Sequence, residues 1–217
     1  MRVIRLVTTL WLASVLGLVP AAAQPANAQA GHKRFQELYS AGDYSAALGE
    51  ARKNEANAKR RGTNNIDYVS ALNDLARAHY QLGHYAEAAK MFQRVVDALQ
   101  ENIPKNDSRL LQAKNNLADV YFRLTRYADA ERLYKQTLDI MTGSLPTGDP
   151  ALIEVITRLG TVYMSQSRYD EAEQQFSQAL SSAEQAGLSN STQVAVTLNN
   201  LTKIYEDQGR FTRQRET

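Results

Sequence analysis

Residues 71–96 read ALNDLARAHYQLGHYAEAAKMFQRVV, and the same pattern returns at intervals of 42 residues. It reads AKNNLADVYFRLTRYADAERLYKQTL at 113–138 and VITRLGTVYMSQSRYDEAEQQFSQAL at 155–180, and a shortened copy at 197–211 reads TLNNLTKIYEDQGRF. Two sets of large residues keep this interval: Leu75, Leu117, Leu159 and Leu201, and Tyr85, Tyr127, Tyr169 and Phe211. A fixed period of this size indicates a solenoid of stacked units.

Each period holds two amphipathic segments separated by a short turn. In the first, Gly83 and His84 form the turn, because Gly readily adopts the positive φ that ends a helix. The second segment ends before Pro104, which cannot continue a helix. The predicted fold is therefore all-α, an α-solenoid of antiparallel helix pairs. Its full units are 67–108, 109–150 and 151–192, with a degenerate first helix pair at 31–66 and an incomplete unit at 193–217.

The first 23 residues have the parts of a secretory signal peptide. Arg2 and Arg5 precede an apolar run at 6–19, and small alanines follow at 21–23. The run of 14 residues is short for a bilayer core of about 30 Å at about 1.5 Å per helical residue. An uncleaved membrane anchor is the alternative interpretation.

Cleavage is expected after Ala23 or as late as Ala28, with 24–30 as a flexible lead. We therefore expect an exported protein, in the bacterial periplasm or secreted, with no membrane span after cleavage. Removing the two leader arginines leaves 23 basic and 23 acidic residues, a balance that argues against a non-specific nucleic-acid binder. The sequence has no cysteine, which excludes disulfides and thiolate chemistry.

The repeated positions have a packing logic, because small residues let two helices approach while large ones fill the space beside them. The small positions are Ala76, Ala118 and Gly160 in the first helix and Ala88, Ala130 and Ala172 in the second. The large positions are the recurring leucines, together with Phe92, Tyr134 and Phe176, and Tyr121, Tyr163 and Tyr205 with His79 in the first unit. We predict that these residues, and the tyrosines that open each second helix, form the core and bind no cofactor.

The unit at 109–150 resembles the tetratricopeptide repeat. Its matching positions are Leu117, Ala118, Tyr121, Thr125, Tyr127, Ala130, Tyr134 and Thr137, where Thr125 replaces the turn glycine and Thr137 a small alanine. The common repeat has about 34 residues, whereas the 42-residue form is similar to the kinesin light chain class. The resemblance covers 67–217 and, more weakly, 31–66. It implies a right-handed α-solenoid and a scaffold that binds a protein or peptide partner.

Stacked helix pairs form a concave face lined mainly by the first helix of each pair. The exposed residues predicted to face a peptide there are Asn73, Arg77, Asn115, Asp119, Arg123, Asn199 and Lys203. An Asn amide can pair with both the N–H and the C=O of an extended peptide, and matching Asn positions contact peptide in the proteins that this chain resembles. The alternative is that these asparagines bond neighbouring helices. Because acidic side chains mix with the basic ones, a dedicated clamp for a C-terminal carboxylate is not expected.

Catalysis has little support in the sequence. The chain has three histidines, and His79 and His84 are five residues apart, not the three or four that align ligands on one helix face. No nucleophile elbow, phosphate loop or dinucleotide fingerprint is present. We expect a non-enzymatic protein without catalytic, cofactor-binding or metal-binding residues.

The last unit lacks the pattern of a complete second helix after Phe211, so Leu198, Leu201 and Ile204 are expected to be partly open. Two alternative functions follow. One is a self-associating or truncated module that forms a homo-oligomer through this C-terminal face. The other, by analogy with exported relatives, is the regulatory repeat part of a longer enzyme such as a caspase-like peptidase.

Overall fold

The structure is a computed structural model that describes residues 26–63 and 65–209. The predicted signal peptide at 1–23 and residues 210–217, including Phe211, lie outside the described residues. The chain divides into two compact units, residues 1–120 and 121–217, which are described separately. Helices without strands make up both units within the described residues, which confirms the all-α class.

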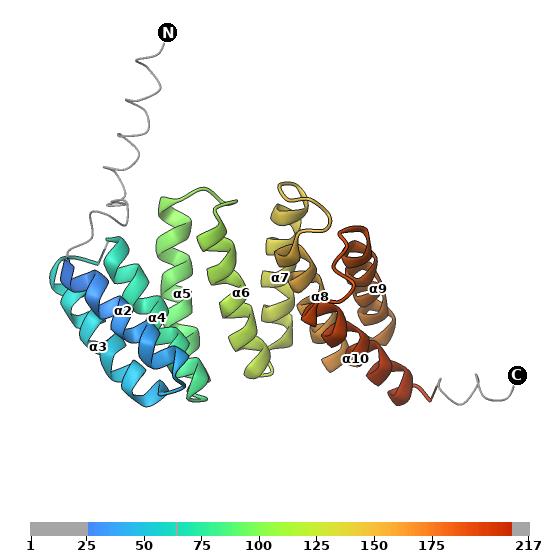
Figure 1. The fold of residues 1–217 in the computed structure, drawn as a ribbon, viewed down its shortest axis with the longest axis horizontal. Helices are drawn as coiled ribbons and strands as arrows, with labels where there is room; N and C mark the ends of the chain where they lie inside the picture. The colour runs from blue at the N-terminus through green and yellow to red at the C-terminus, as the bar shows by residue number, and fades with distance from the viewer. Residues whose placement is uncertain (1–25, 64, 210–217) are drawn as a thin grey trace, which may run out of the picture. The chain divides into compact units, whose positions relative to one another are not determined.

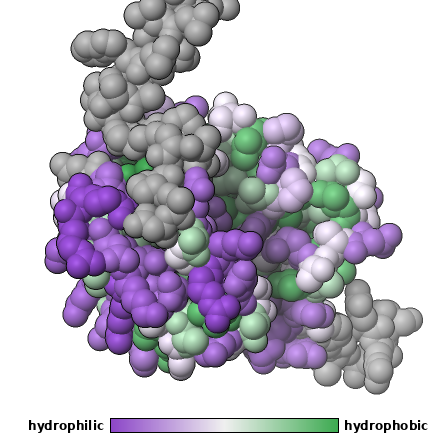
Figure 2. Space-filling view, turned by 60° about the vertical axis from the view of Figure 1, so that its left-hand side comes forward, coloured by the Kyte–Doolittle hydropathy of each residue, from purple (hydrophilic) through white to green (hydrophobic). Residues whose placement is uncertain are grey.

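The N-terminal unit consists of successive helices, coloured from blue to yellow-green in Figure 1. They are α2 (Ala26–Ser40), α3 (Tyr44–Arg60), α4 (Ile66–Gln81), α5 (Tyr85–Asn102) and α6 (Ser108–Arg123), whose last residues lie in the second unit. Helix α2 packs against α3 and α4, α3 packs against α4, and α4 packs against α5. Hydrophilic side chains dominate the side of this unit that comes forward in Figure 2.

The expected flexible lead at 24–30 is wrong from Ala26 onward, because these residues form the first turns of α2. The segment has no glycine or proline between Ala26 and Ala30, and three of its five residues are alanine, the best helix former. Gly31 does not interrupt the helix. A Cβ on Gly31 would lie 2.1 Å from Oδ1 of Asn54, so the glycine gives α3 a close approach to α2.

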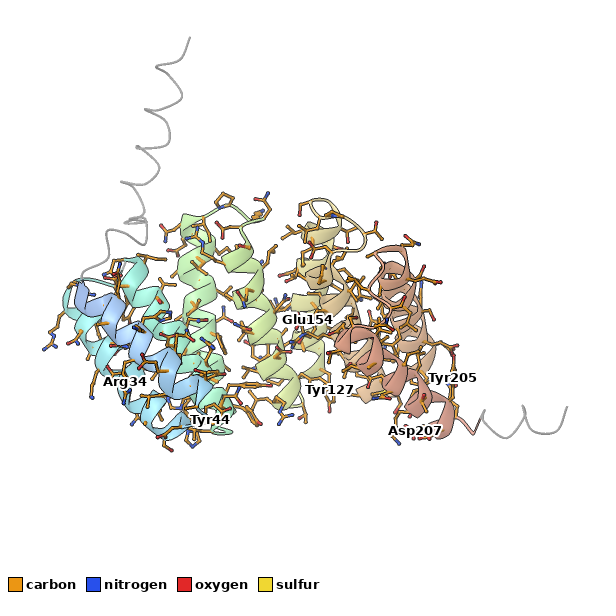
Figure 3. All side chains as sticks on the ribbon, in the orientation of Figure 1. Arg34, Tyr44, Tyr127, Glu154, Tyr205 and Asp207 are labelled. Atoms are coloured by element: carbon orange, nitrogen blue, oxygen red, sulfur yellow. The ribbon has the colours of Figure 1, made fainter. Side chains whose placement is uncertain are left out.

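The second unit continues the pattern with α7 (Tyr127–Thr142), α8 (Pro150–Ser165), α9 (Tyr169–Gln185) and α10 (Thr192–Asp207). Helix α8 packs against α7 and α9, and α10 packs against both α8 and α9. Connections of three residues between the paired helices agree with antiparallel neighbours. Figure 3 shows Tyr44 and Tyr127 at the starts of α3 and α7, where each second helix begins.

The first helix of each repeat begins at 66, 108, 150 and 192, one residue before each predicted unit boundary. A polar residue with a short side chain precedes every start and accepts a backbone N–H of the first turn, as an N-cap does. These caps also recur every 42 residues: Asn65 to Tyr68 N, Asp107 to Arg109 N, Asp149 to Ala151 N and Ser191 to Val194 N. The period therefore specifies helix starts as well as core positions.

The residues predicted to form the core are largely buried. The recurring leucines are 1–8% exposed, and Phe92, Tyr134 and Phe176 are 0–3% exposed. Gly160 replaces the alanine of the other repeats, because a Cβ there would lie 2.6 Å from a ring carbon of Phe176.

Two predictions need correction. The tyrosines that open the second helices were predicted to lie in the core, but Tyr85, Tyr127 and Tyr169 are only half-buried. Leu198, Leu201 and Ile204 were predicted to be partly open, but Leu201 and Ile204 are buried, and of the three only Leu198, at 49%, is exposed.

Candidate functional site

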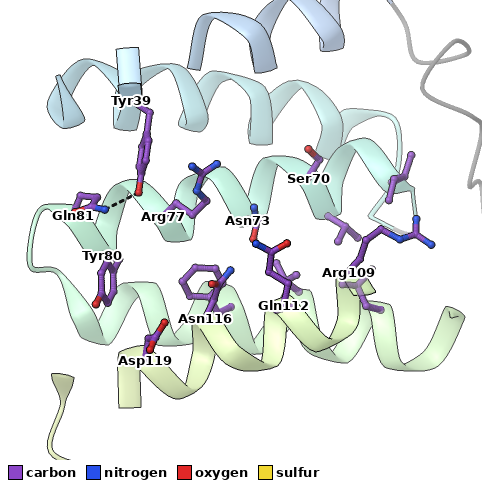
Figure 4. A pocket seen from close by; sticks show the side chains of 16 residues that line it. Tyr39, Ser70, Asn73, Arg77, Tyr80, Gln81, Arg109, Gln112, Asn116 and Asp119 are labelled. Carbon is purple, nitrogen blue, oxygen red and sulfur yellow. Dashed lines mark hydrogen bonds between the residues drawn. The ribbon is translucent and has the colours of Figure 1, made fainter. Parts of the chain in front are cut away.

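The N-terminal unit contains a groove of about 920 Å³ between α4 and α6, with α5 as its floor and Tyr39 of α2 at one end. All of its lining residues lie before Val120. Figure 4 shows polar side chains of α4 and α6 reaching into the same space. A volume of this size is typical of sites that hold a small molecule or a short peptide segment.

The floor is apolar. Phe92, Val95 and Leu99 lie on one face of α5 with spacings of three and four residues, as neighbours on a helix surface do. Each is at most 6% exposed, so the floor is part of the core of the unit. An apolar side chain placed here would be removed from water, which is worth roughly 25 cal/mol per Å² of buried apolar area.

The walls are polar. Helix α4 contributes Ser70, Asn73, Arg77 and Gln81, and α6 contributes Arg109, Gln112, Asn116 and Asp119. Within each set the spacing is three or four residues, which places the side chains along one side of the helix. Four carboxamides and a hydroxyl present both donors and acceptors, so the walls suit the alternating N–H and C=O groups of an extended backbone.

Arg77 is held in place by three contacts. Its guanidinium carbon lies 4.3 Å from the ring centroid of Tyr39 and 5.6 Å from that of Phe35, and its Nη1 lies 3.7 Å from Oδ1 of Asp74. Gln81 donates a hydrogen bond of 2.8 Å to the hydroxyl of Tyr39. Helix α2 therefore orients the polar groups at this end of the groove.

Arg109 is also restrained, at the other end of the α6 wall. Its guanidinium donates two hydrogen bonds, of 2.9 and 2.7 Å, to the carboxylate of Asp107. This contact lowers the pKa of Asp107 and raises the pKa of Arg109. Much of the positive charge of Arg109 is thus neutralised within the protein.

Behind Arg77, Asp74 is buried, with 1% exposure, and pairs with the half-exposed His32 at 2.6 Å between Oδ2 and Nδ1. The hydrogen bond to Asp74 raises the pKa of His32, although partial burial opposes this effect. Burial raises the pKa of Asp74, and the contact with His32 offsets part of that rise. The two residues are 42 positions apart, so equivalent positions of α2 and α4 meet.

The structure brings together only some of the residues predicted from sequence to contact a peptide. Asn73, Arg77 and Asp119 line the groove, whereas Asn115 does not. Asn115 is the equivalent of Asn73, but α6 is turned differently toward this groove and presents Asn116 in place of Asn115. The remaining three lie outside it: Arg123 is exposed at the end of α6, and Asn199 and Lys203 are exposed on α10.

Sequence reasoning missed several groove residues. Gln112 and Asn116 are four residues apart on α6, and this polar i,i+4 pair was the available signal for a second wall. Tyr39 had no comparable signal, because its place in the groove depends on the packing of α2 against α4.

Lys203, a predicted site residue outside the groove, forms an ion pair of 2.7 Å with Asp207 on its own helix.

The predicted core position of His79 is confirmed, since it is 8% exposed. Its Nδ1 lies 3.3 Å from Nδ1 of His84 across the turn. No group of three His, Cys, Asp or Glu side chains that could hold a metal occurs in the part of the chain that the structure describes. Within the same residues, no helix has the length and apolarity that crossing a membrane requires.

Comparisons with known proteins agree with this architecture. A tetratricopeptide repeat model matches residues 32–103 and 73–140, and a second tetratricopeptide repeat model matches 149–213. A comparison with curated proteins finds no significant match.

Several solved structures share the fold. The nearly identical TPR-like repeats of a Podosopora anserina protein assigned as a kinesin light chain superpose with a TM-score of 0.76 at 18% identity, covering 89% of this chain and 92% of that one. BtubC (BKLC) from P. vanneervenii gives 0.68 at 21% identity over 84% and 73% of the two chains. The apo form of RapI gives 0.66 at 15% identity over 88% and 73%. The repeats, the helix pairs and the family matches lead to one conclusion: this chain belongs to the tetratricopeptide repeat family, and its fold is an α-solenoid.

Proposed function

We propose that this protein is an exported, non-enzymatic scaffold that binds an extended peptide segment of a protein partner in the groove between α4 and α6. Tetratricopeptide repeats are protein–protein interaction scaffolds, and this groove is the site that best fits such a role. The observation that carries the proposal is the combination of an apolar floor with walls rich in carboxamides.

The chemistry of the groove favours a peptide over a small charged ligand. Asn73, Gln112 and Asn116 can each pair with peptide N–H and C=O groups, and the floor at Phe92 and Val95 can take an apolar side chain. The fixed charges of the walls are mixed, with Arg77 and Arg109 opposed by Asp119. Specificity would therefore come from backbone pairing and from one buried side chain.

The test uses peptides selected from a random display library against the full chain, with affinity measured by fluorescence anisotropy. We expect the double variant Asn73→Ala/Asn116→Ala to bind a selected peptide at least about 10-fold more weakly, a loss of about 1.4 kcal/mol. The matched control is Gln100→Ala/Gln178→Ala, which changes two exposed carboxamides on α5 and α9 and should alter Kd less than about twofold. Equal affinities of the two double variants, with unchanged circular dichroism, would exclude the groove as the site.

Export rests on the leader pattern of Arg2, Arg5 and the apolar run at 6–19. Expression with the natural leader followed by mass spectrometry of the exported protein should give a mature chain that begins after Ala23 or Ala28. Full-length protein confined to the cytoplasm would contradict this part of the proposal. The same preparation tests the alternative of self-association, because light scattering at high concentration distinguishes a monomer from an oligomer.

A further inference from the structure

A buried carboxylate behind the groove connects the groove to the surface of α2. His32 of α2 contacts Asp74 of α4 at 2.6 Å between Nδ1 and Oδ2, and the other carboxylate oxygen of Asp74 lies 3.7 Å from Nη1 of Arg77. Arg77 lines the groove, whereas Asp74 and His32 do not. The three side chains therefore form a chain of contacts from an imidazole outside the groove to a guanidinium inside it.

The imidazole of His32 can exchange protons with solvent, while the carboxylate of Asp74 is shielded. The side chain of His32 is 44% exposed and that of Asp74 is 1% exposed. On the other side of the ring, Nε2 of His32 lies 3.3 Å from Nε2 of Gln36, one turn further along α2. The amide of Gln36 can turn to donate to the neutral ring or to accept from the protonated ring. Both protonation states of His32 therefore have partners.

The other charged groups around His32 are paired with each other. A small cavity of about 30 Å³ where α2, α3 and α4 meet is lined by His32 and Asp74, together with Arg61 after α3 and Asp67 of α4. Nη2 of Arg61 donates to Oδ2 of Asp67 at 2.8 Å, so these two charges offset each other. The lining residues that belong to α3 are neutral: Asn54, Asn57 and Ala58.

Protonation of His32 changes how strongly Asp74 holds Arg77. A neutral imidazole gives the carboxylate a neutral hydrogen bond and leaves Arg77 as its cationic partner. An imidazolium gives it a charge-assisted hydrogen bond, which is roughly twice as strong, and adds one positive charge beside the pair. Asp74 then neutralises less of the charge that Arg77 presents to the groove.

The electrostatic effects on His32 agree with this connection. The hydrogen bond to Asp74 raises the pKa of His32 above its ordinary value of 6.5, partial burial opposes the rise, and the positive charge of Arg77 opposes it further. His32 and Arg77 thus act on each other across the carboxylate that both contact.

We propose that His32 regulates the groove, so that the groove binds its peptide more tightly as the pH falls from 8 to 6. This regulation rests on the proposed peptide-binding function. A main-chain carbonyl or a carboxylate of the peptide competes with Asp74 for the guanidinium of Arg77, and protonation of His32 moves that competition toward the peptide. Linkage requires the reciprocal effect, in which the bound peptide raises the pKa of His32.

The binding test uses a peptide from the display selection that has blocked termini and no histidine, so that the probe does not titrate between pH 6 and pH 8. The wild type should bind it about 5-fold more tightly at pH 6 than at pH 8, the lower end of typical couplings between sites. His32→Asn keeps a donor for Asp74 but does not titrate, and it should bind with the same Kd at both pH values. The matched control His84→Asn changes an exposed histidine outside the groove and should keep the wild-type ratio.

Two results would overturn the regulation while leaving the groove as the binding site. One is equal wild-type affinity at the two pH values for a peptide whose binding Asn73→Ala/Asn116→Ala weakens. The other is a wild-type ratio that survives in His32→Asn, because another group would then be responsible. Selected peptides whose binding does not depend on Asn73 and Asn116 would instead remove the proposed function, and the regulation with it.

NMR of the free protein tests the connection between His32 and Arg77 without a peptide. The ring resonance of His32, assigned by its loss in His32→Asn, should titrate with a higher pKa in Arg77→Gln than in the wild type, because the variant removes a neighbouring positive charge. Adding the peptide to the wild type should move the midpoint of the same titration upward. An unchanged midpoint in Arg77→Gln would overturn the proposal.

Discussion

The turn between α4 and α5 at 82–84, here called a corner, has the same backbone hydrogen bonding as the corners at 124–126 and 166–168. The side chains of the three corners differ. In each corner a backbone N–H reaches the carbonyl five residues earlier, as in a Schellman motif. These bonds are His84 to His79 at 2.9 Å, Arg126 to Tyr121 at 2.8 Å and Arg168 to Tyr163 at 3.0 Å. The corner geometry is therefore a property of the backbone and tolerates different side chains.

The side chains that meet over this common backbone differ in kind. The first corner brings two imidazoles together, with ring centroids 5.5 Å apart. The other two stack an arginine on a tyrosine at 4.2 Å from the ring centroid, Arg126 on Tyr121 and Arg168 on Tyr163. The same two positions thus hold a pH-sensitive pair of imidazoles in the first repeat. In the other two they hold a cation–π contact that involves no histidine.

The residue at the left-handed position differs as well. Gly83 has φ of 76°, while Thr125 and Ser167 have φ of 58° and 59°. A residue with a Cβ is strained in this region. The two later corners keep the turn because the packing on either side of it specifies the conformation.

The largest expected difference between the corners comes from truncating the ring. Tyr163→Ala should cost about 3–5 kcal/mol of stability, because it empties a buried site and removes the ring under Arg168. His79→Ala should cost about 1–2 kcal/mol, since the side chain removed is smaller. Urea unfolding followed by circular dichroism measures both, with Tyr163→Phe as the control that keeps the ring. Equal costs for the two alanine variants would show that the corners are energetically equivalent.

Exchanging the residues at the left-handed position should have a moderate effect. Gly83→Thr is expected to destabilise by about 1–2 kcal/mol, because threonine is strained at positive φ. Thr125→Gly relieves that strain but gives the unfolded chain more freedom, so a gain of at most about 1 kcal/mol is expected. The shifts in Tm of the two variants should have opposite signs. A loss of stability in Thr125→Gly would mean that the threonine side chain contributes to the turn.

A smaller effect is expected from the stacked arginine. Arg168 also forms an ion pair of 2.7 Å with Glu131 and a contact with Glu171. A double-mutant cycle of Arg168→Met and Tyr163→Leu should give a coupling of about 0.5–1 kcal/mol. The matching cycle at His84 and His79 should give a smaller coupling at pH 8. A coupling near zero at Arg168 would show that the stacking seen in the structure adds no stability.

The smallest expected effect is a pH dependence confined to the first corner. Burial lowers the pKa of His79, with His84 and Arg52 adding to the effect and Glu87 opposing it. The unfolded chain, with a pKa near 6.5, therefore binds protons more readily than the folded one. The contribution of His79 should be fully present above pH 6.5 and should fall as the pH drops below 6.5 toward the folded pKa.

The double variant His79→Tyr/His84→Arg, which builds the later corners into the first, should remove this decline. Stability measured from pH 8 to pH 5 for the wild type and the variant tests it. The raised pKa of His32 acts in the opposite direction and is common to both proteins, so the difference between the two profiles isolates the corner. Parallel profiles would contradict the role of His79.

Much of the fold could be predicted because its signals are local and repeated. Leucine, small-residue and turn positions return every 42 residues, and the first helix of each regular repeat begins within one residue of its predicted unit. The candidate groove was harder to predict. Asn73 and Arg77 were found because they lie beside core leucines of α4, but Asn115 was chosen in place of Asn116. Periodicity makes equivalent residues look alike, although neighbouring helices present different sides to the same groove.

The sequence by itself determined the repeat, most of the buried positions and the helix starts of the regular repeats, because each depends on contacts between residues close in the chain or one period apart. Only the tertiary structure decided which polar residues share a space. The stacking of Arg77 on Tyr39 and the polar cavity at Asp67 and Asp74 both depend on how α2 and α3 pack against α4. That packing joins helices of the degenerate pair to a regular repeat, and the repeat pattern alone does not specify it.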